Sequence, residues 1–139
     1  MDVKGTREIL FRGKRIDNGE WVEGYFVNLW LIHYQKHQPI ITDNNAVSYD
    51  VDPPTVGQYT GLTDKNGKKI FEGDIVAIER GWNETVKYHV FFDPQICGFI
   101  GDSINYIGFT TFGDDGINME VIGNIHDNPE LLKDFNKGV

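Results

Sequence analysis

The chain has 139 residues, of which 40% are hydrophobic and 24% charged, and this is the size and composition of one globular domain. Its formal net charge of -8 disfavours non-specific binding to nucleic acid, because such binding depends on Lys and Arg contacts to phosphate. The single cysteine excludes an internal disulfide and a cysteine-rich zinc site. With no apolar stretch long enough for a signal peptide or a membrane span, we expect a cytoplasmic protein.

The first predicted element is a β-hairpin. Residues 7–12 alternate apolar and charged side chains, the Asn-Gly pair at 18–19 suits a tight turn, and residues 21–29 form the return strand. The return strand carries a row of apolar side chains of one parity: Trp21, Tyr25, Val27 and Leu29. The following segment, 30–38, fits either a continued strand or an irregular connection.

Two short strands are predicted next, at residues 39–42 and 46–51, around a turn at 43–45. Asp52-Pro53-Pro54 then ends regular structure, because each proline fixes φ and lacks an N–H donor. We interpret the whole chain, 1–139, as one domain. The proline break allows an N-terminal β subdomain, 1–51, followed by a central and C-terminal β barrel, 52–139.

The central region is rich in turn signals. Residues 55–62 predict a strand interrupted by glycines, residues 64–68 a turn with Asn-Gly at its tip, and residues 70–71 a return strand. Gly73 and Asp74 predict a second turn, which leads into a strand at 75–79. There the glycine permits the turn and the aspartate accepts hydrogen bonds from backbone donors.

The C-terminal half predicts further strands and one helix. The strongest strand covers residues 85–92 and has in step the side chains of Val86, Tyr88, Val90 and Phe92. Three more candidate strands are residues 97–100, 106–112 and 118–125. Asn128 caps a short helix that runs to about residue 135. The fold is therefore mostly β, either a small SH3-like barrel or two packed β subdomains built from hairpins, with one C-terminal helix.

The most specific motifs lie between residues 51 and 76. They read Thr-Val-Gly-Gln-Tyr-Thr-Gly-Leu at 55–62, Asp-Lys-Asn-Gly-Lys at 64–68 and Glu-Gly-Asp-Ile-Val at 72–76. These motifs resemble the central signature of the YopX family. Residues 7–12, 21–25, 120–126 and 128–132 resemble the strands near its two ends. We interpret the signature residues as structural: Thr55, Gly57, Gln58, Tyr59, Gly61, Gly67, Glu72, Gly73 and Asp74.

The resemblance implies a mostly β protein typical of phages and prophages of Gram-positive bacteria, acting inside the bacterial host. It implies no catalytic residues that could be transferred to this chain. The resemblance therefore implies no enzyme activity beyond what the residues themselves indicate.

Few residues suggest catalysis or metal binding. His33 and His37 would share one face of a helix as metal ligands, but their segment need not be helical, and we interpret both as ordinary polar positions. Cys97 has neither a base nor a positive charge beside it in sequence, which favours a half-buried strand residue over a nucleophile. We expect His89 to face solvent and His126 to bond backbone or water.

An acidic set could in principle bind a cation, but its spacing matches no calcium loop and a solvated loop is the simpler interpretation. The set comprises Asp93, Asp102, Asp114, Asp115 and Glu120. We therefore predict no catalytic residue, no cofactor and no metal site.

A basic set on two predicted hairpins could bind single-stranded nucleic acid, if aromatic rings nearby supplied stacking surfaces. The basic residues are Arg7, Arg12, Lys14, Arg15, Lys65, Lys68 and Lys69. The candidate rings are Tyr25, Trp30, Tyr59 and Trp82. The net charge opposes this function, and lysines at hairpin tips commonly serve solvation alone.

Three functions remain open. The leading one is a non-catalytic binding module for a host or phage protein. The second is nucleic-acid binding through the basic hairpins. The third is an enzyme whose site assembles only in the fold, and it predicts a concave pocket containing His or carboxylates with a perturbed pKa. Self-association through β edges and exposed aromatic residues is also expected to be feasible.

Overall fold

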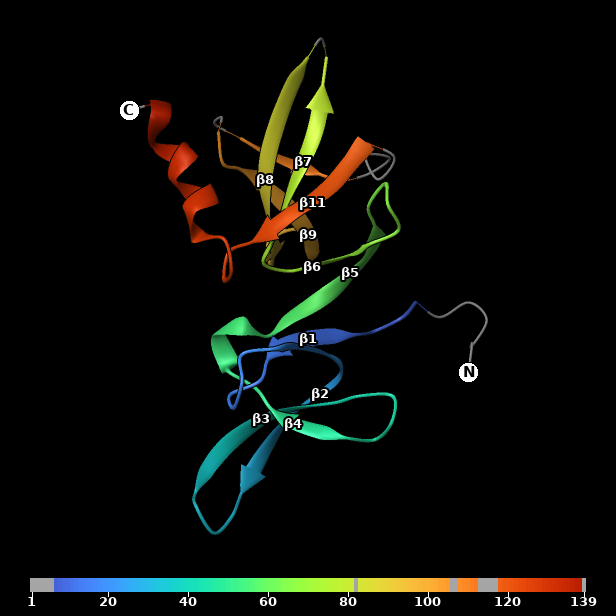
Figure 1. Ribbon diagram of the computed structural model, residues 1–139, viewed down its shortest axis with the longest axis vertical. Coiled ribbons are helices and arrows are strands. Elements are labelled where there is room, and N and C mark those ends of the chain that lie inside the picture. Colours follow the sequence, from blue (N-terminus) through green and yellow to red (C-terminus); the bar gives the residue numbers. More distant parts are fainter. Residues whose placement is uncertain (1–6, 82, 106–107, 113–117, 139) are drawn as a thin grey trace. The chain divides into compact units, whose positions relative to one another are not determined.

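The computed structural model describes residues 7–81, 83–105, 108–112 and 118–138 (Figure 1). The chain divides into two compact units, Met1–Gly61 and Leu62–Val139. The described residues form two antiparallel sheets, and they contain 3-10 helices but no α-helix. None of the helices in these residues is long and apolar enough to cross a membrane.

The first sheet has six strands in the order β4-β3-β2-β1-β5-β6. Its strands are β1 (Phe11–Lys14), β2 (Trp21–Leu31), β3 (Lys36–Thr42), β4 (Ser48–Asp50), β5 (Gly57–Thr63) and β6 (Lys69–Phe71). The predicted N-terminal hairpin is present as β1 and β2, with Phe11 opposite Gly24 and Lys14 opposite Trp21. The ambiguous segment after residue 29 continues β2, turns, and begins β3.

The N-terminal unit has a small core on one face of this sheet. Ile41 on β3 and Val51 are fully buried. Gly13 on β1 lies against them, and a Cβ there would meet Ile41 Cδ1 and Val51 Cβ at 3.2 Å each. A short 3-10 helix, η1 (Pro53–Thr55), is tied to β1 because Thr55 Oγ1 accepts a hydrogen bond from the Lys14 backbone N–H at 2.9 Å.

The second sheet has five strands in the order β10-β9-β8-β7-β11. Its strands are β7 (Asp74–Arg80), β8 (Glu84–Asp93), β9 (Gly98–Ser103), β10 (Phe109–Thr111) and β11 (Met119–Asn124). Alternate residues of β7 and β8 point into the main core of the C-terminal unit. That core consists of Ile70, Val76, Ile78, Val86, Tyr88, Val90, Phe112 and Met119.

The turn at Gly73 and Asp74 joins the strands of the C-terminal unit. Gly73 has a φ of +92°, its N–H donates to Val90 O, and its carbonyl accepts from the Ile125 N–H. The buried Asp74 carboxylate accepts from the Phe71 N–H at 2.8 Å, as expected for an aspartate that holds a turn. These bonds explain why the turn takes Gly followed by Asp.

The predicted barrel and the predicted α-helix are both corrected. The strand orders are open, so the described residues contain two sheets and no closed barrel. The C-terminal segment is a 3-10 helix, η3 (Pro129–Gly138), with the Leu131 N–H donating to Asn128 O. Asn128 does not cap it as expected, because Asn128 Oδ1 accepts instead from the Asn124 N–H at 3.1 Å.

Candidate functional site

The β2–β3 hairpin extends beyond the strands that flank it. β1 pairs with β2 only over residues 21–24, and β4 pairs with β3 only over residues 40–42. Among the described strands, residues 25–31 pair only with residues 36–42, and Pro39 O also accepts a hydrogen bond from the Val51 N–H (Figure 1, lower end). Beyond residue 24 the hairpin is therefore a two-stranded ribbon, and most of its β2 side chains are exposed, although the Phe26 ring lies 5.6 Å from that of Phe11.

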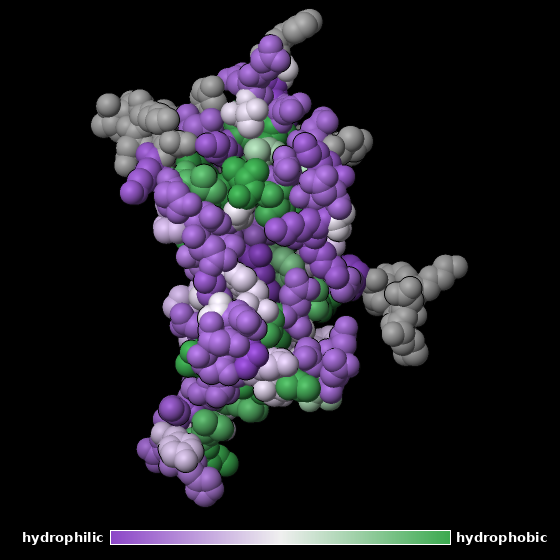
Figure 2. All heavy atoms as spheres, viewed as in Figure 1, coloured by the Kyte–Doolittle hydropathy of each residue, from purple (hydrophilic) through white to green (hydrophobic). Residues whose placement is uncertain are grey.

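Large apolar side chains cover this ribbon and are exposed. On one face β2 carries Tyr25, 63% exposed, with Val27 and Leu29 in step behind it. The tip carries Ile32 and Tyr34, which are 76% and 73% exposed. Trp30, 53% exposed, lies on the opposite face and its ring is 4.9 Å from that of His37. Figure 2 shows hydrophobic side chains at the surface where this hairpin ends.

The hairpin also differs in charge from the rest of the protein. The chain has 21 Asp and Glu residues, yet none lies between residues 24 and 42. Lys36 is the one Lys or Arg in that stretch, beside His33 and His37. Burying this surface against another molecule therefore desolvates few charges, which keeps the cost of association low.

The two histidines of the hairpin do not form the helical pair that a metal site would require. His33 lies in the turn before β3, and His37 lies on β3 itself, where both are exposed. Within the described part of the chain, no group of three or more His, Cys, Asp or Glu residues could hold a metal ion.

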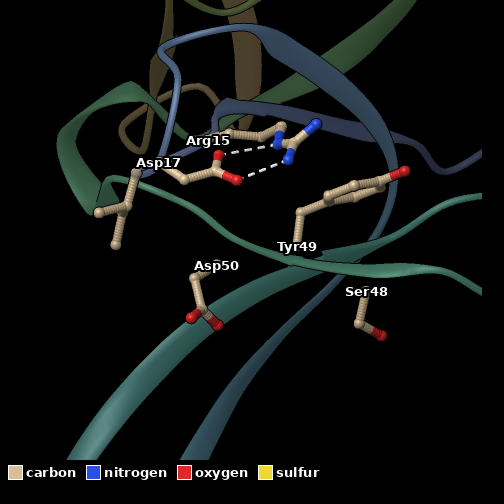
Figure 3. Close-up of a pocket in the computed structure, with 6 residues that line it drawn as sticks. Arg15, Asp17, Ser48, Tyr49 and Asp50 are labelled. Atoms are coloured by element: carbon tan, nitrogen blue, oxygen red, sulfur yellow. Dashed lines mark hydrogen bonds and ion pairs between the residues drawn. The ribbon is translucent and has the colours of Figure 1, made fainter.

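A polar cavity of about 420 Å³ lies elsewhere in the N-terminal unit (Figure 3). Its lining residues are Arg15, Ile16, Asp17, Ser48, Tyr49 and Asp50. Arg15 Nε donates to Asp17 Oδ1 at 2.9 Å, and Arg15 Nη2 donates to Asp17 Oδ2 at 2.6 Å. The guanidinium carbon lies 4.6 Å from the centre of the Tyr49 ring.

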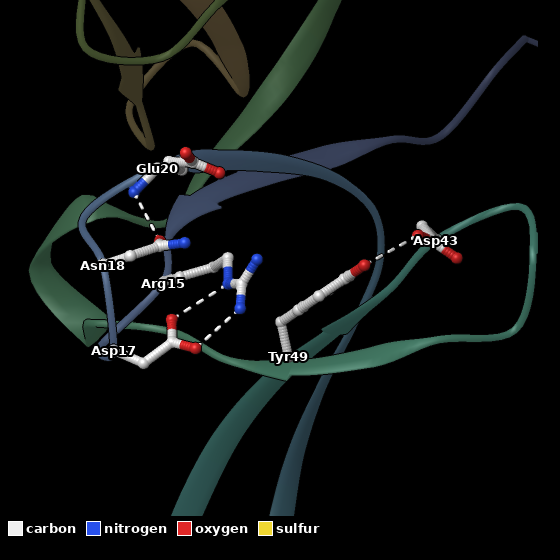
Figure 4. A network of polar contacts seen from close by, with 6 residues as sticks. All are labelled: Arg15, Asp17, Asn18, Glu20, Asp43 and Tyr49. Atoms are coloured by element: carbon white, nitrogen blue, oxygen red, sulfur yellow. Dashed lines mark hydrogen bonds and ion pairs between the residues drawn. The ribbon is translucent and has the colours of Figure 1, made fainter.

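The positive charge of the Arg15 guanidinium is largely compensated by the polar contacts around it (Figure 4). The hydrogen bonds to Asp17 raise the pKa of Arg15, and the same bonds lower the pKa of Asp17. The Tyr49 hydroxyl donates to Asp43 Oδ2 at 3.3 Å. An anionic ligand would have to displace Asp17 from Arg15 and would also meet Asp50, so this cavity suits anions poorly.

The basic residues that the sequence grouped together belong to two different units. Arg7, Arg12, Lys14 and Arg15 belong to the N-terminal unit, and Lys65, Lys68 and Lys69 to the C-terminal unit. Arg12 is buried, and its guanidinium carbon lies 4.5 Å from the centre of the Trp21 ring, while Lys14 Nζ lies 5.4 Å from it. Lys65 pairs with Glu120 at 3.4 Å. Nucleic-acid binding by this set stays a prediction.

The candidate stacking rings also differ in their exposure. Tyr25 and Trp30 are exposed on the β2–β3 hairpin, whereas Tyr59 is buried on β5. Trp82 lies outside the described residues. The exposed rings therefore belong to a segment with one lysine.

A second cavity, of about 200 Å³, lies in the C-terminal unit and is lined by His89, Asp102, Ser103, Ile104 and Leu132. Burial lowers the pKa of His89, the Asp102 carboxylate opposes this shift, and His126 adds to it. The prediction that His89 faces solvent is corrected here. Leu132 on η3 shares its cavity, so the face opposite Tyr88 and Val90 is half-covered.

This cavity contains the residue types of a catalytic triad without the geometry of one. His89 lies opposite Asp102, whereas Ser103 lies opposite Tyr88, whose side chain belongs to the core. Because successive residues of a strand point to opposite faces, the Ser103 side chain is directed away from His89. The cavity is also smaller than the roughly 300–1,000 Å³ typical of small-molecule sites.

Two other candidates from the sequence, a cysteine and the acidic set, do not lie as predicted or lie partly outside the described residues. Cys97 is exposed, outside the strand predicted for it, in a turn with a φ of +52°. The tight turn between β8 and β9 explains the difference, because Asp93 Oδ1 accepts from the Gln95 N–H and Cys97 Sγ lies 3.7 Å from Pro94 O. Of the acidic set, Asp114 and Asp115 lie outside the described residues.

The molecule is therefore a mostly β protein with two units. It has two open antiparallel sheets and a protruding apolar hairpin. The model of the family described as YopX protein matches residues 10–133, and the chain belongs to that family. No curated protein sequence matches the chain.

The chain is also similar to a solved structure, the protein EF1440 from Enterococcus faecalis. The TM-score is 0.57 at 23% sequence identity, and the likeness covers 91% of this chain and 99% of that one. At this identity the likeness shows a shared fold. Nothing about activity follows from it.

Sequence reasoning predicted strands at 21–29 and 39–42 of the β2–β3 hairpin, but it left residues 30–38 open and missed that the apolar row is exposed. The signal that could have shown it is the charge pattern. A stretch without a single Asp or Glu, in a chain of net charge -8, marks residues 24–42 as different from an ordinary solvated hairpin.

Proposed function

We propose that this protein is a non-catalytic binding module for a protein partner, and that the β2–β3 hairpin is its recognition surface. The observation that carries the proposal is the group of large apolar side chains exposed on one protruding ribbon, above all Tyr25, Ile32 and Tyr34. Contiguous exposed apolar surface on a small protein marks interaction sites, and tyrosine and tryptophan are enriched in them.

The charge of the hairpin supports a particular kind of partner. Lys36, His33 and His37 lie at the tip, and no carboxylate of residues 24–42 opposes them. The partner surface that suits this ribbon is an apolar patch with carboxylates at its rim. As a member of a family typical of phages and prophages, the protein acts on a host or phage protein in the bacterial cytoplasm under this proposal.

The test compares proteins captured from host lysate by three immobilised forms of the chain. The recognition variant is Ile32→Ser with Tyr34→Ser, at the tip of the hairpin. The control is Ile96→Ser, an exposed isoleucine in the turn between β8 and β9. Wild type and control should capture one protein at near-native abundance and the recognition variant should lose it. Equal capture by all three forms, or none by wild type, would contradict the proposal.

Nucleic-acid binding is the second candidate, and one observation favours it. Arg12 and Lys14 both lie over the Trp21 ring, which combines cations with an aromatic surface in the way that single-stranded nucleic acid sites do. Binding of this kind should fall steeply with added salt and weaken in Lys14→Gln. A titration of single-stranded DNA and RNA at low salt that detects no binding would remove this candidate.

The enzyme candidate has weaker support. A cavity with a histidine of lowered pKa is what it predicted, and His89 supplies one. The small volume of the cavity argues against this candidate, and so does the direction of the Ser103 side chain, which points away from His89.

A further inference from the structure

The outer edge of β2 is open beyond the end of β1. Pro39 O accepts from the Val51 N–H, so the backbone of Pro39 is directed away from β2. Because successive residues of a strand direct their backbone groups to alternate sides, Gln38 and Ile40 bond to β2, at Leu29 and Val27. The N–H and C=O groups of Phe26, Asn28 and Trp30 therefore point outward, and no other strand of the described residues pairs with them.

The two edges of the ribbon differ in a way that matters for association. Proteins commonly blunt exposed edge strands with proline, charges or bulges, because an open edge pairs readily with another strand. The β3 edge carries Pro39, which has no N–H to donate. The β2 edge from residue 25 to residue 31 has no proline, no charge and no bulge in its register with β3.

The apolar character of this edge is symmetric about Asn28. Val27 and Leu29 flank it, then Phe26 and Trp30, then Tyr25 and Leu31. If two such strands paired antiparallel with Asn28 opposite Asn28, every other pair would be apolar, and Phe26 would lie opposite Trp30. Aromatic and aliphatic cross-strand pairs stabilise a sheet, whereas like charges placed opposite each other destabilise it. None of these residues is charged, although each copy carries a net charge of -8.

We propose that β2 pairs edge to edge with β2 of a second copy of this chain, in antiparallel register centred on Asn28. The two hairpins then form one four-stranded ribbon with two-fold symmetry, which is the commonest symmetry of homo-oligomers. Phe26, Asn28 and Trp30 of each copy supply the backbone hydrogen bonds. The exposed rows of Tyr25, Val27 and Leu29 from both copies join into one continuous apolar face.

This self-pairing goes beyond the proposed function, since the edge of β2 forms the dimer while the tip and the open face stay free. A second copy fits better than an unrelated extended segment, because the symmetric order of side chains matters only when the strand meets itself. An unrelated segment would pair equally well with an asymmetric edge.

The test uses charges at the symmetry centre and measures mass by light scattering coupled to gel filtration. Wild type should have twice the 15.9 kDa mass of the chain. In Asn28→Lys and in Asn28→Asp, like charges would meet across the two-fold axis, and each variant alone should be monomeric. An equimolar mixture of the two variants should recover the dimer, because Lys then lies opposite Asp. Asn18→Lys, in the exposed β1–β2 turn, is the control and should remain dimeric.

Three outcomes would overturn the proposal: a monomeric wild type, a dimer that both Asn28 variants retain, or variants that stay monomeric when mixed although each is folded by circular dichroism. None of these results depends on whether the hairpin captures a host protein. The mass measurement and the capture experiment can therefore fail separately.

Discussion

The β2–β3 and β7–β8 hairpins are built alike and used differently. Each is a long antiparallel pair of strands, and β2, β7 and β8 each carry a row of apolar side chains at alternate positions. On β7–β8 the row is buried under Ile70, Phe112 and Met119 and forms the core of its unit. On β2–β3 the corresponding row, from Tyr25 to Leu29, has no such cover among the described residues and is exposed.

This difference shows what alternation specifies and what it leaves open. A period of two fixes which side chains share a face, and so it restricts the register in which two strands pair. Whether that face is buried depends on other segments of the chain. On β7–β8 the covering residues come from β6, from the residue after β10 and from β11. Where no segment supplies them, an apolar face is available to a partner.

The largest expected effect comes from shortening a side chain of the buried row. Ile78→Ala removes a side chain that is 1% exposed, and should lower the free energy of unfolding by about 3 kcal/mol. Ile32→Ala, at the exposed tip of β2–β3, should change it by less than about 0.5 kcal/mol. Urea unfolding followed by tryptophan fluorescence measures both. Equal losses would mean that the tip of β2–β3 is buried, and would end the distinction between the hairpins.

Two turns repeat the comparison on a smaller scale. Asp43 and Asp64 each begin a turn in which the backbone N–H donates to a carbonyl four residues later, at 2.9 and 2.8 Å. In each, Oδ1 accepts two further backbone N–H groups of the turn. They differ in the second oxygen, because Asp64 Oδ2 is buried and accepts from the Val121 N–H at 3.0 Å, which joins the turn to β11.

Replacing each aspartate by asparagine should separate the two turns. Asp64→Asn puts an N–H₂ group in front of the Val121 N–H, which loses its acceptor, and should cost about 2 kcal/mol. Asp43→Asn keeps both Oδ1 bonds and affects only the bond with the Tyr49 hydroxyl, whose oxygen can accept from Nδ2 instead, so no more than about 0.5 kcal/mol is expected. Chemical unfolding at neutral pH measures the two costs, and a larger loss for Asp43→Asn would contradict the assignment.

The pH dependence gives a second measure of Asp64. Burial alone would raise its pKa, but hydrogen bonds from the Val121, Lys68 and Asn66 N–H groups outweigh burial, and the pKa lies below 3.8. A lowered pKa in the folded state stabilises the protein above the unfolded value, and this contribution disappears as the pH falls through the folded value. The stability gap between wild type and Asp64→Asn should therefore begin to narrow as the pH falls toward 3.8, and it should continue to narrow as the pH falls through the lower folded pKa.

Local features of the fold were predictable because their causes lie close together in the sequence. The Asn-Gly turn of the first hairpin, the turn at 64–68 and the junction at Gly73 and Asp74 each depend on residues a few positions apart. The Val121 donor of Asp64 lies 57 positions away, and no local pattern reveals it. No local pattern reveals which residues cover the apolar row of β7–β8 either.

The errors of prediction arose where short-range signals favoured an element that the chain does not form. Asn128 and Pro129 are good signals for the start of an α-helix, but the Asn128 side chain bonds the Asn124 N–H and η3 forms instead. Successive strands suggested a barrel, whereas the sheets stay open. For the candidate site, composition located the basic residues, but only the fold shows that they divide between two units and that Arg12 is buried.

A smaller effect on stability is expected at the residue with a positive φ in each of the turns that Asp43 and Asp64 begin. Ala46 has a φ of +61° and Gly67 a φ of +80°, a region that costs a side chain roughly 1–2 kcal/mol. Ala46→Gly should therefore stabilise the protein by about 1 kcal/mol, and Gly67→Ala should destabilise it by a similar amount. A Cβ at Gly67 would have no atom within 4 Å, so the cost there is conformational. Thermal unfolding of both variants measures the opposite signs, and two changes of the same sign would contradict the shared geometry.

The smallest expected effect concerns the second face of β7–β8. The pKa of His89 is lowered from 6.5 by burial beside Leu132 on η3, so the unfolded chain binds a proton more readily than the folded one. Stability linked to His89 is therefore present above pH 6.5 and is lost as the pH falls from 6.5 through the folded pKa. His89→Gln should remove this loss, while His33→Gln, on the exposed turn of β2–β3, should retain it. Unfolding measured between pH 7 and pH 5 tests whether β7–β8 is also covered on its His89 face. An unchanged slope in His89→Gln would mean that this face is solvated.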